Sequence, residues 1–295
     1  MMSKVRNGFL ALALTMLTTN AISCDIDGIT GIVEENSMYI PVGAKSAGGL
    51  TEDQFNRVID KVEKVYKPII KEMGANLVIE RKWDDGTVNA YARQSGSTWH
   101  VAMFGGLARH ETITEDGFAT VVCHEIGHHI GGAPKKSSWW GSSWASNEGQ
   151  ADYFGTSKCL RKMMENEDNA TIVANMDIPA HVTKKCNANF TNAEDITMCQ
   201  RGSMAGLSLA NLFRSLRNLS QELKFTTPDS NVVSSTNHNH PAPQCRLDTY
   251  FQGALCDVDH NTDVDQDDAL IGTCNRVDNY VDGVRPKCWY KPSNS

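Results

Sequence analysis

The sequence predicts a single α+β domain, with a small sheet packed on a central helix, a helical C-terminal part and a cysteine-rich tail. Two observations predict it. Apolar residues recur at helical spacing in one early segment, strand-like segments follow it, and further helical segments come later. The 295-residue chain is also 40% hydrophobic and 21% charged, which is the composition of a globular protein and not of a disordered one.

A capping box at Thr51–Gln54 begins the first predicted helix, which ends at Gly74. Three predicted strands follow as a meander. Turn residues separate these strands, which cover Asn76–Trp83, Thr87–Arg93 and Thr98–Phe104.

Thr114 caps the next predicted helix, which has acidic residues in its first turn and ends at Ile130 before a glycine pair. Later helices are predicted over Ala145–Met164, Thr197–Leu219 and Gln244–Cys256. The remaining tail, residues 256–295, is acidic and rich in Cys.

Residues 1–23 have the layout of a secretory signal peptide, with basic residues before a short apolar run. That run, Phe9–Leu17, is well short of the ~20 residues that a membrane span needs. We therefore expect residues 24–295 to be exported, to the periplasm or cell envelope or as a secreted protein. The formal net charge of −7 also argues against a nucleic-acid partner.

Cys24 stands where a bacterial lipobox places its lipidated cysteine, although Ala21 replaces the commoner Leu three residues before it. Lipidation would attach the chain to a membrane through Cys24, and ordinary signal cleavage after Ala21 is the alternative. The chain has nine Cys, and setting Cys24 aside leaves an even number. In an exported protein, an even number of cysteines indicates disulfides.

The most informative segment is an HExxH motif formed by His124, Glu125 and His128. On a helix, residues four apart lie on one face, so both imidazoles can reach one Zn²⁺ ion. Glu125 can lie beside a water on that ion without binding the metal itself. Because the motif falls on a capped, apolar helix, we favour a zinc site over two unrelated surface histidines.

A catalytic zinc site needs a third protein ligand and an open position for water. Pro134 stands where a metzincin would have its third His, but Glu148 and Asp152 share one face of the next predicted helix. We expect Glu148 to complete the zinc site and Asp152 to orient a ligating His through a hydrogen bond. Two alternatives are that Asp152 binds the metal in place of Glu148, and that both lie on an exposed acidic face.

HExxH followed by ExxAD resembles the gluzincin metallopeptidases. The resemblance is strongest to the family of the CAAX prenyl protease, the mitochondrial inner-membrane stress protease and the periplasmic outer-membrane quality-control proteases. Further stretches are similar to that family: Asn89–Ala92, Gly106 with Leu107, and His240 and Pro241 followed by Arg246 and Leu247.

The resemblance implies that residues 24–295 form a zincin-like metallopeptidase domain. His124, His128 and Glu148 would hold Zn²⁺, Glu125 would be the general base, and Asp152 would support a ligand. A peptide or an unfolded protein would be the substrate.

The resemblance also implies roles outside the motif helix. The strand at Asn89–Ala92 would pair with an extended substrate. His240 would approach the site and either stabilise the oxyanion or gate the metal. Arg246 would support its loop, with pairing to an acid as one way of doing so. His238 competes with His240 for this role, and a solvated His-rich loop is the alternative for both.

Two disulfides are expected from the predicted positions of the cysteines. Cys123 precedes the first motif His, and Cys159 lies on the predicted helix that would supply the third ligand. These two helices have to meet at the metal, so we expect a Cys123–Cys159 disulfide, with a buried free thiol as the alternative. Cys186–Cys199 is a second, local expectation.

A second metal site is suggested by oxygen-bearing residues at the loop positions of an EF-hand, although Thr262 replaces the turn glycine. Ca²⁺ is therefore a candidate cofactor beside Zn²⁺, and a solvated acidic loop is the alternative. The six candidate ligands are Asp257, Asp259, Asn261, Asp263, Asp265 and Asp268.

Together these patterns predict an exported zinc metalloendopeptidase with Glu125 and His240 as catalytic residues. A zinc-binding chaperone or scaffold that does not hydrolyse peptides is the alternative. A loop with Trp139, Trp140 and Trp144 would either form a hydrophobic substrate lip or pack over the zinc helices.

Overall fold

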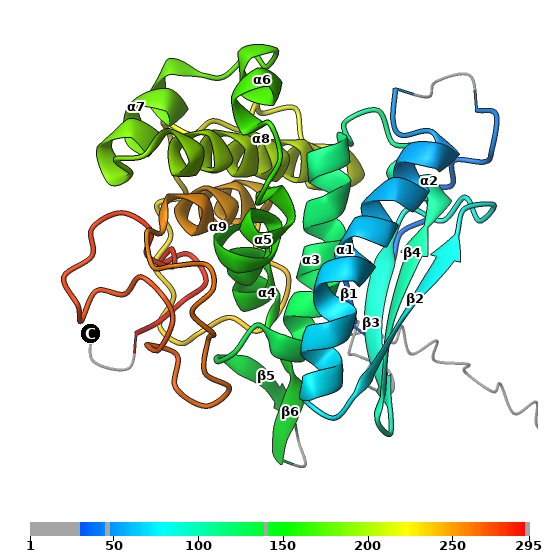
Figure 1. Cartoon of the computed structure of the whole chain (residues 1–295), viewed down its shortest axis with the longest axis horizontal. Helices are drawn as coiled ribbons and strands as arrows, with labels where there is room; N and C mark the ends of the chain where they lie inside the picture. The colour runs from blue at the N-terminus through cyan, green and yellow to red at the C-terminus, as the bar shows by residue number, and fades with distance from the viewer. Residues whose placement is uncertain (1–29, 45–47, 139–140, 293–295) are drawn as a thin grey trace, which may run out of the picture.

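The computed structural model describes residues 30–44, 48–138 and 141–292 (Figure 1). The expectations for the signal peptide, for Cys24 and for Trp139 and Trp140 lie outside these residues. The elements follow along the chain as β1 (Thr30–Gly31), α1 (Glu52–Glu72), β2 (Asn76–Lys82), β3 (Ala90–Ser95), β4 (Thr98–Phe104), α2 (Gly105–Ala108), α3 (Glu115–Ile130), β5 (Lys135–Ser138), β6 (Gly141–Ser146), α4 (Glu148–Phe154), the π-helical turn η1 (Gly155–Cys159), α5 (Leu160–Met164), α6 (Asn169–Ala174), α7 (Ala180–Asn189), α8 (Ala193–Leu216) and α9 (Pro243–Leu255).

The main sheet has the strand order β1-β3-β4-β2, so the predicted meander is wrong in its pairing. β3 and β4 form an antiparallel hairpin, but β2 pairs with β4 in parallel, from Asn76 opposite Thr98 to Lys82 opposite Phe104. β4 takes the centre because its last four side chains are all buried, whereas β2 alternates between buried and exposed positions. A two-stranded hairpin of β5 and β6 lies apart from this sheet.

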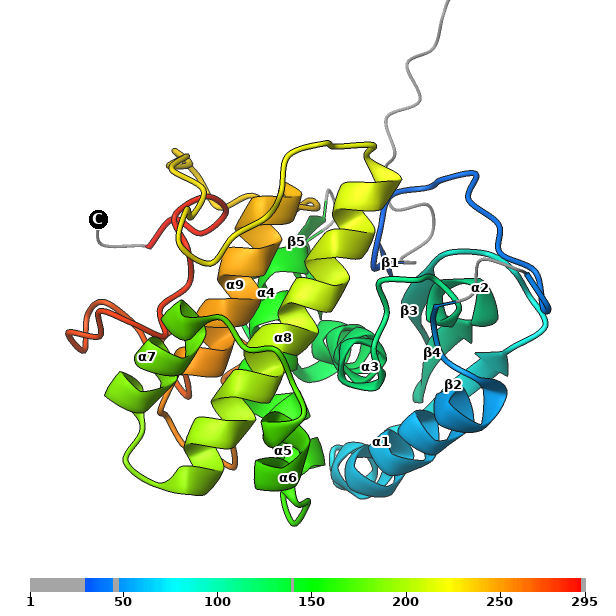
Figure 2. The same cartoon turned by 90° about the horizontal axis from the view of Figure 1, so that it is seen from above.

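Helix α3 lies at the centre of the molecule. Figure 2 looks down this helix and shows the sheet and α1 on one side of it and α4, α8 and α9 on the other. Every α3 residue from Gly117 to Ile130 is buried. A helix buried on all sides has no solvent face for polar residues, so its histidines and its glutamate have to find partners inside the protein.

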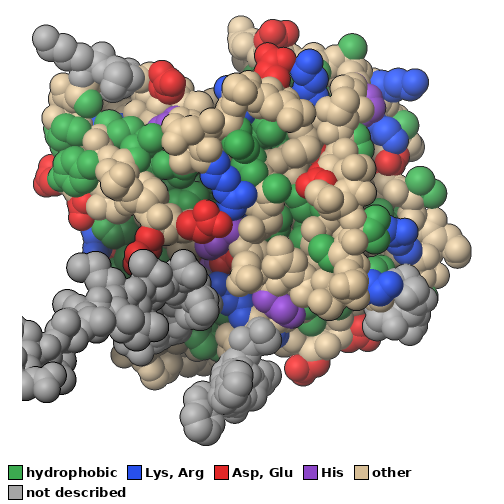
Figure 3. All heavy atoms as spheres, turned by 180° about the vertical axis from the view of Figure 1, so that it is seen from behind, with side chains coloured by type: hydrophobic (Ala, Val, Ile, Leu, Met, Phe, Trp, Pro, Cys, Tyr) green, Lys and Arg blue, Asp and Glu red, His purple; other side chains and the backbone are tan. Residues whose placement is uncertain are grey.

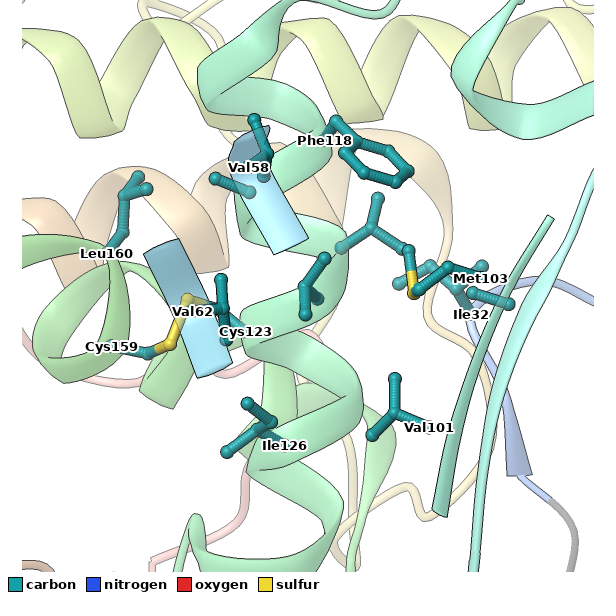
Figure 4. Packing of buried hydrophobic residues seen from close by; sticks show 14 of the residues in the cluster. Ile32, Val58, Val62, Val101, Met103, Phe118, Cys123, Ile126, Cys159 and Leu160 are labelled. Atoms are coloured by element: carbon teal, nitrogen blue, oxygen red, sulfur yellow. A yellow bond between two sulfur atoms is a disulfide. The ribbon is translucent and has the colours of Figure 1, made fainter. Parts of the chain in front are cut away.

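The hydrophobic core surrounds α3. Figure 4 shows Phe118 and Ile126 of this helix between Met103 and Val101 of β4 and side chains of α1. The same view shows the disulfide between Cys123 on α3 and Cys159 on η1.

Four disulfides are present among the described residues. Cys123–Cys159 and Cys186–Cys199 confirm the two predicted pairs. Cys245–Cys288 connects α9 to the tail, and Cys256–Cys274 closes a loop within the tail, directly after α9. The described part of the tail, residues 256–292, contains no helix or strand, so Cys245–Cys288 is the disulfide that fixes it to the helical part of the domain.

The α+β class is confirmed, but several predicted boundaries shift. The helix predicted over Ala145–Met164 begins later, because Ala145 belongs to β6 and the side chain of Asn147 caps α4. It also changes to π-helical geometry at η1. In the same way, Asn192 caps α8, which begins at Ala193 and not at Thr197.

Among the described residues, no helix combines the length and the apolar character that crossing a membrane requires.

Candidate metal centre

Helix α3 presents His124 and His128 toward the same interior point, and each ring is fixed by a bond from its other nitrogen. Nδ1 of His128 lies 2.8 Å from the backbone oxygen of Ser146. A carbonyl only accepts, so this Nδ1 carries the proton and Nε2 keeps its lone pair. Nδ1 of His124 lies 2.7 Å from Oδ1 of Asp152, which fixes the same tautomer.

Glu148 completes the group from the first turn of α4. Its Oε2 lies 3.2 Å from Nε2 of His124, and its Oε1 lies 3.7 Å from Nε2 of His128. The three candidate ligand atoms lie within 4.8 Å of one another. We refer to His124, His128 and Glu148 as the metal group. Helix α4 can approach α3 this closely at Gly127, where a Cβ atom would already lie 3.2 Å from the backbone of Ala151.

The side chains of this group fit a metal ion. Nε2 of both histidines and both oxygens of Glu148 are buried without a hydrogen-bond partner, as are both oxygens of Glu125. Unpaired buried acceptors are costly, and a cation bound between them would satisfy those of His124, His128 and Glu148. Two imidazoles and one carboxylate suit Zn²⁺ and other divalent transition metals. The alternative of an exposed acidic face is excluded, because Glu148 and Asp152 are both 0% exposed.

Asp152 is held by a network that the sequence revealed only in part. The guanidinium of Arg246 donates two hydrogen bonds to its carboxylate, both of 2.7 Å, and the hydroxyl of Tyr250 donates a third, of 2.5 Å. The acid that pairs with Arg246 is therefore Asp152. Tyr250 was missed, although it lies four residues after Arg246, on the same face of α9.

His240 reaches the same site and His238 does not. Nε2 of His240 lies 3.3 Å from Oε2 of Glu148 and 2.7 Å from the backbone oxygen of Gly31. The ring of His238 instead lies against the side chain of Asn147, at 3.4 Å. Of the two histidines, His240 is the one placed to contact a molecule at the metal group.

Lys136 is a member of the site that sequence reasoning missed. It extends from β5, is 9% exposed, and places Nζ 2.9 Å from Oε1 of Glu148. No spacing in the sequence connects a strand Lys to a helix Glu twelve residues later, so this contact comes from the fold alone. It puts a positive charge beside the carboxylate of the metal group.

Burial and neighbouring charges shift the pKa values in the group. Burial raises the pKa of Glu125 to about 8. Burial alone would lower the pKa of His124, but the carboxylates of Asp152 and Glu148 raise it to about 9, so a cation that binds Nε2 has to displace a proton from it. Burial would raise the pKa of Glu148, but its electrostatic interactions with the neighbouring His240 and Lys136 side chains bring it well below its ordinary value. Perturbed groups of this kind gather at functional sites.

The β5–β6 hairpin is fastened beside the metal group by an aromatic stack. The ring of His129 lies between Trp99 of β4 and Trp144 of β6, with centroid distances of 5.1 and 4.9 Å. For Trp144, packing is therefore the observed role. The stack holds β6, whose Ser146 oxygen orients His128.

The candidate calcium ligands are not brought together. In the part of the chain that the structure describes, they form no group of three acidic ligand atoms within 4.8 Å, and no helix follows their loop. Several of their carboxylates instead accept hydrogen bonds from nearby backbone N–H groups. One oxygen of Asp265 accepts the N–H groups of Asp267 and Asp268, and Asp259 accepts that of Asn261.

The surface near the site carries both signs of charge. Figure 3 shows histidines beside acidic and basic side chains near the middle of one face. A cavity at the N-terminal segment is lined by residues that include Val33, Arg217, His240 and Arg246. The side chains of the HExxH motif do not line it, so this cavity stops short of the metal group.

Comparison with known protein families, with curated proteins and with solved structures finds no match to this chain. The site is therefore interpreted from its own chemistry.

Proposed function

We propose that this protein is an exported zinc-dependent metalloendopeptidase with a zincin-like catalytic domain. The observation that carries the proposal is the convergence of Nε2 of His124, Nε2 of His128 and the carboxylate of Glu148 at one buried point, where neither Nε2 atom has a hydrogen-bond partner, on the helix pair that also carries Glu125. Structural zinc sites commonly use four protein ligands, whereas three ligands and a nearby carboxylate are typical of catalytic zinc.

Zinc bound by His124, His128 and Glu148 would supply Lewis acidity toward the scissile carbonyl and toward water. Glu125 takes the proton of the attacking water and passes it to the leaving amine. His240 donates a hydrogen bond to the carbonyl oxygen as negative charge develops there.

The substrate class that we propose is an extended peptide or an unfolded protein. The four disulfides support export to an oxidising compartment, either the periplasm and cell envelope, with Cys24 lipidated, or the exterior. A zinc-binding scaffold without turnover remains the competing function.

The test measures zinc content and hydrolysis of unfolded casein by the mature chain, with Glu125→Gln as the matched variant. We expect about one zinc per chain in both proteins, since Glu125 is not a ligand, and turnover only in the unmodified chain. Full activity of Glu125→Gln would remove Glu125 from the mechanism. Zinc binding without turnover in either protein would support the scaffold.

A further inference from the structure

The N-terminal segment Thr30–Val33 lies along the edge of β3, beside the metal group. It runs antiparallel to β3, with Gly31 opposite Tyr91. The pairing continues beyond β1, because the N–H of Ile32 donates to the backbone oxygen of Ala90 at 3.0 Å. This is the strand geometry in which an extended peptide adds to a sheet edge.

Two residues of the candidate site bind the backbone of this segment. Nε2 of His240 donates to the oxygen of Gly31 at 2.7 Å, and the same nitrogen lies 3.3 Å from Oε2 of Glu148. Nη1 of Arg246 donates to the oxygen of Ile32 at 2.6 Å. One imidazole therefore connects a backbone carbonyl of the chain to a ligand of the metal group.

The metal group is closed in this arrangement. His124, Glu125, His128 and Glu148 are each 0% exposed. A peptidase has to admit both water and a substrate strand to its metal, so a peptide cannot be cleaved while the site is closed in this way.

We propose that Thr30–Val33 is an autoinhibitory strand that occupies the substrate position on β3 and keeps the enzyme latent. This inference rests on the proposed peptidase function. An extended substrate needs the same edge and the same donor of His240, so it binds only after the segment has left. The measured affinity for substrate then equals the intrinsic affinity multiplied by the fraction of molecules in which the edge is free.

The segment is held by more than its backbone. Ile32 is 0% exposed and Val33 is 9% exposed, and both belong to the main hydrophobic core. Figure 4 draws Ile32 in the same cluster as Met103 of β4. A substrate thus competes with a segment that is attached to the same chain and anchored by apolar contacts, which makes the closed form the resting state.

Gly31→Val tests the inference, because a Cβ atom at Gly31 would lie 3.2 Å from the side-chain oxygen of Asn89 and 3.2 and 3.3 Å from the backbone oxygens of Val33 and Ala90. The methyl groups of valine add to this crowding, so we expect the pairing of the segment with β3 to weaken, and none of these contacts is with a residue of the metal group. Gly202→Ala is the matched control, since its Cβ makes only ordinary contact, at 3.4 Å from Ala254. Near-UV circular dichroism checks folding, and Gly31→Ala replaces the valine variant where that variant does not fold.

The zinc-loaded Gly31→Val protein should hydrolyse unfolded casein about tenfold faster than the unmodified chain, the change produced by about 1.4 kcal/mol of lost strand docking. The Gly202→Ala control should match the unmodified rate. A second measurement does not depend on turnover: calorimetry with a synthetic peptide of residues 30–36. The peptide should bind Gly31→Val and not the unmodified chain.

The outcomes separate this inference from the proposed function. Equal casein rates and equal peptide binding in folded Gly31→Val and unmodified protein would overturn the autoinhibitory strand and leave the peptidase standing. Peptide binding by Gly31→Val alone, with no hydrolysis by either protein, would retain the blocked edge and refute the peptidase.

Discussion

Two regions of this chain have metal-ligand spacing in the sequence, and only the first brings its candidate ligand atoms together among the described residues. His124, His128 and Glu148 lie on buried helices, and their ligand atoms converge within 4.8 Å. The acidic loop from Asp257 to Asp268 has EF-hand spacing, yet its side chains bind nearby backbone N–H groups. The spacing of residues in the sequence predicts where their side chains point only when they lie on a regular helix or strand. In a loop the same spacing predicts no common direction.

The largest loss of stability is expected when the buried guanidinium that binds Asp152 is removed. Arg246→Ala leaves the buried Asp152 without its bidentate partner, which should lower the free energy of unfolding by about 3–5 kcal/mol in urea titration. Arg217→Ala is the control, because its pair with Glu34 is largely exposed and is worth about 0–1 kcal/mol. Similar losses in the two variants would show that the buried network does not stabilise the domain.

Asp152→Asn should weaken metal binding without removing a ligand. The amide holds the ring of His124 less strongly, so the affinity for Zn²⁺ should fall by about 10–100-fold in competition with a chromophoric chelator. Asp265→Asn, in the acidic loop, should leave that affinity unchanged. If Asp265→Asn lost zinc affinity instead, the zinc site would have to be assigned to the acidic loop.

Asn147→Ala tests whether the local cap positions Glu148. The side chain of Asn147 accepts the N–H of Gln150 at 2.8 Å, so its loss should lower the free energy of unfolding by about 1 kcal/mol. Zinc affinity should fall with it, because Glu148 lies in the turn that the cap fixes. The matched cap variant Asp168→Ala, on α6, should leave zinc affinity unchanged.

The smallest effect is expected from calcium. A ligand at 100 times its Kd stabilises the folded state by about 2.7 kcal/mol, and zinc at that ratio should raise the Tm accordingly. Millimolar Ca²⁺ should leave the Tm of the zinc-loaded protein unchanged, because the loop carboxylates do not form a common site. A calcium-dependent rise in Tm that Asp265→Asn abolishes would restore the calcium hypothesis.

Local signals predicted those parts of the fold that depend on neighbours in the chain. The caps at Thr51 and Thr114 both accept the expected N–H groups. Sheet order was not predictable in the same way, because the parallel pairing of β2 with β4 depends on which strand buries both faces. The start of α4 was also missed. Ala145 belongs to β6, which pairs with β5, and helical periodicity does not reveal this pairing.

The sequence by itself predicted which residues form the candidate metal centre. Four-residue spacing places His124 and His128 on one helix face, and the ExxxD spacing places Glu148 and Asp152 on one face of α4. Only the tertiary structure decided what surrounds them: Lys136 against Glu148, Tyr250 against Asp152, and Gly31 against His240. The reason is physical. Helical periodicity is a short-range property of the backbone, whereas these contacts join segments whose approach depends on the packing of the whole core.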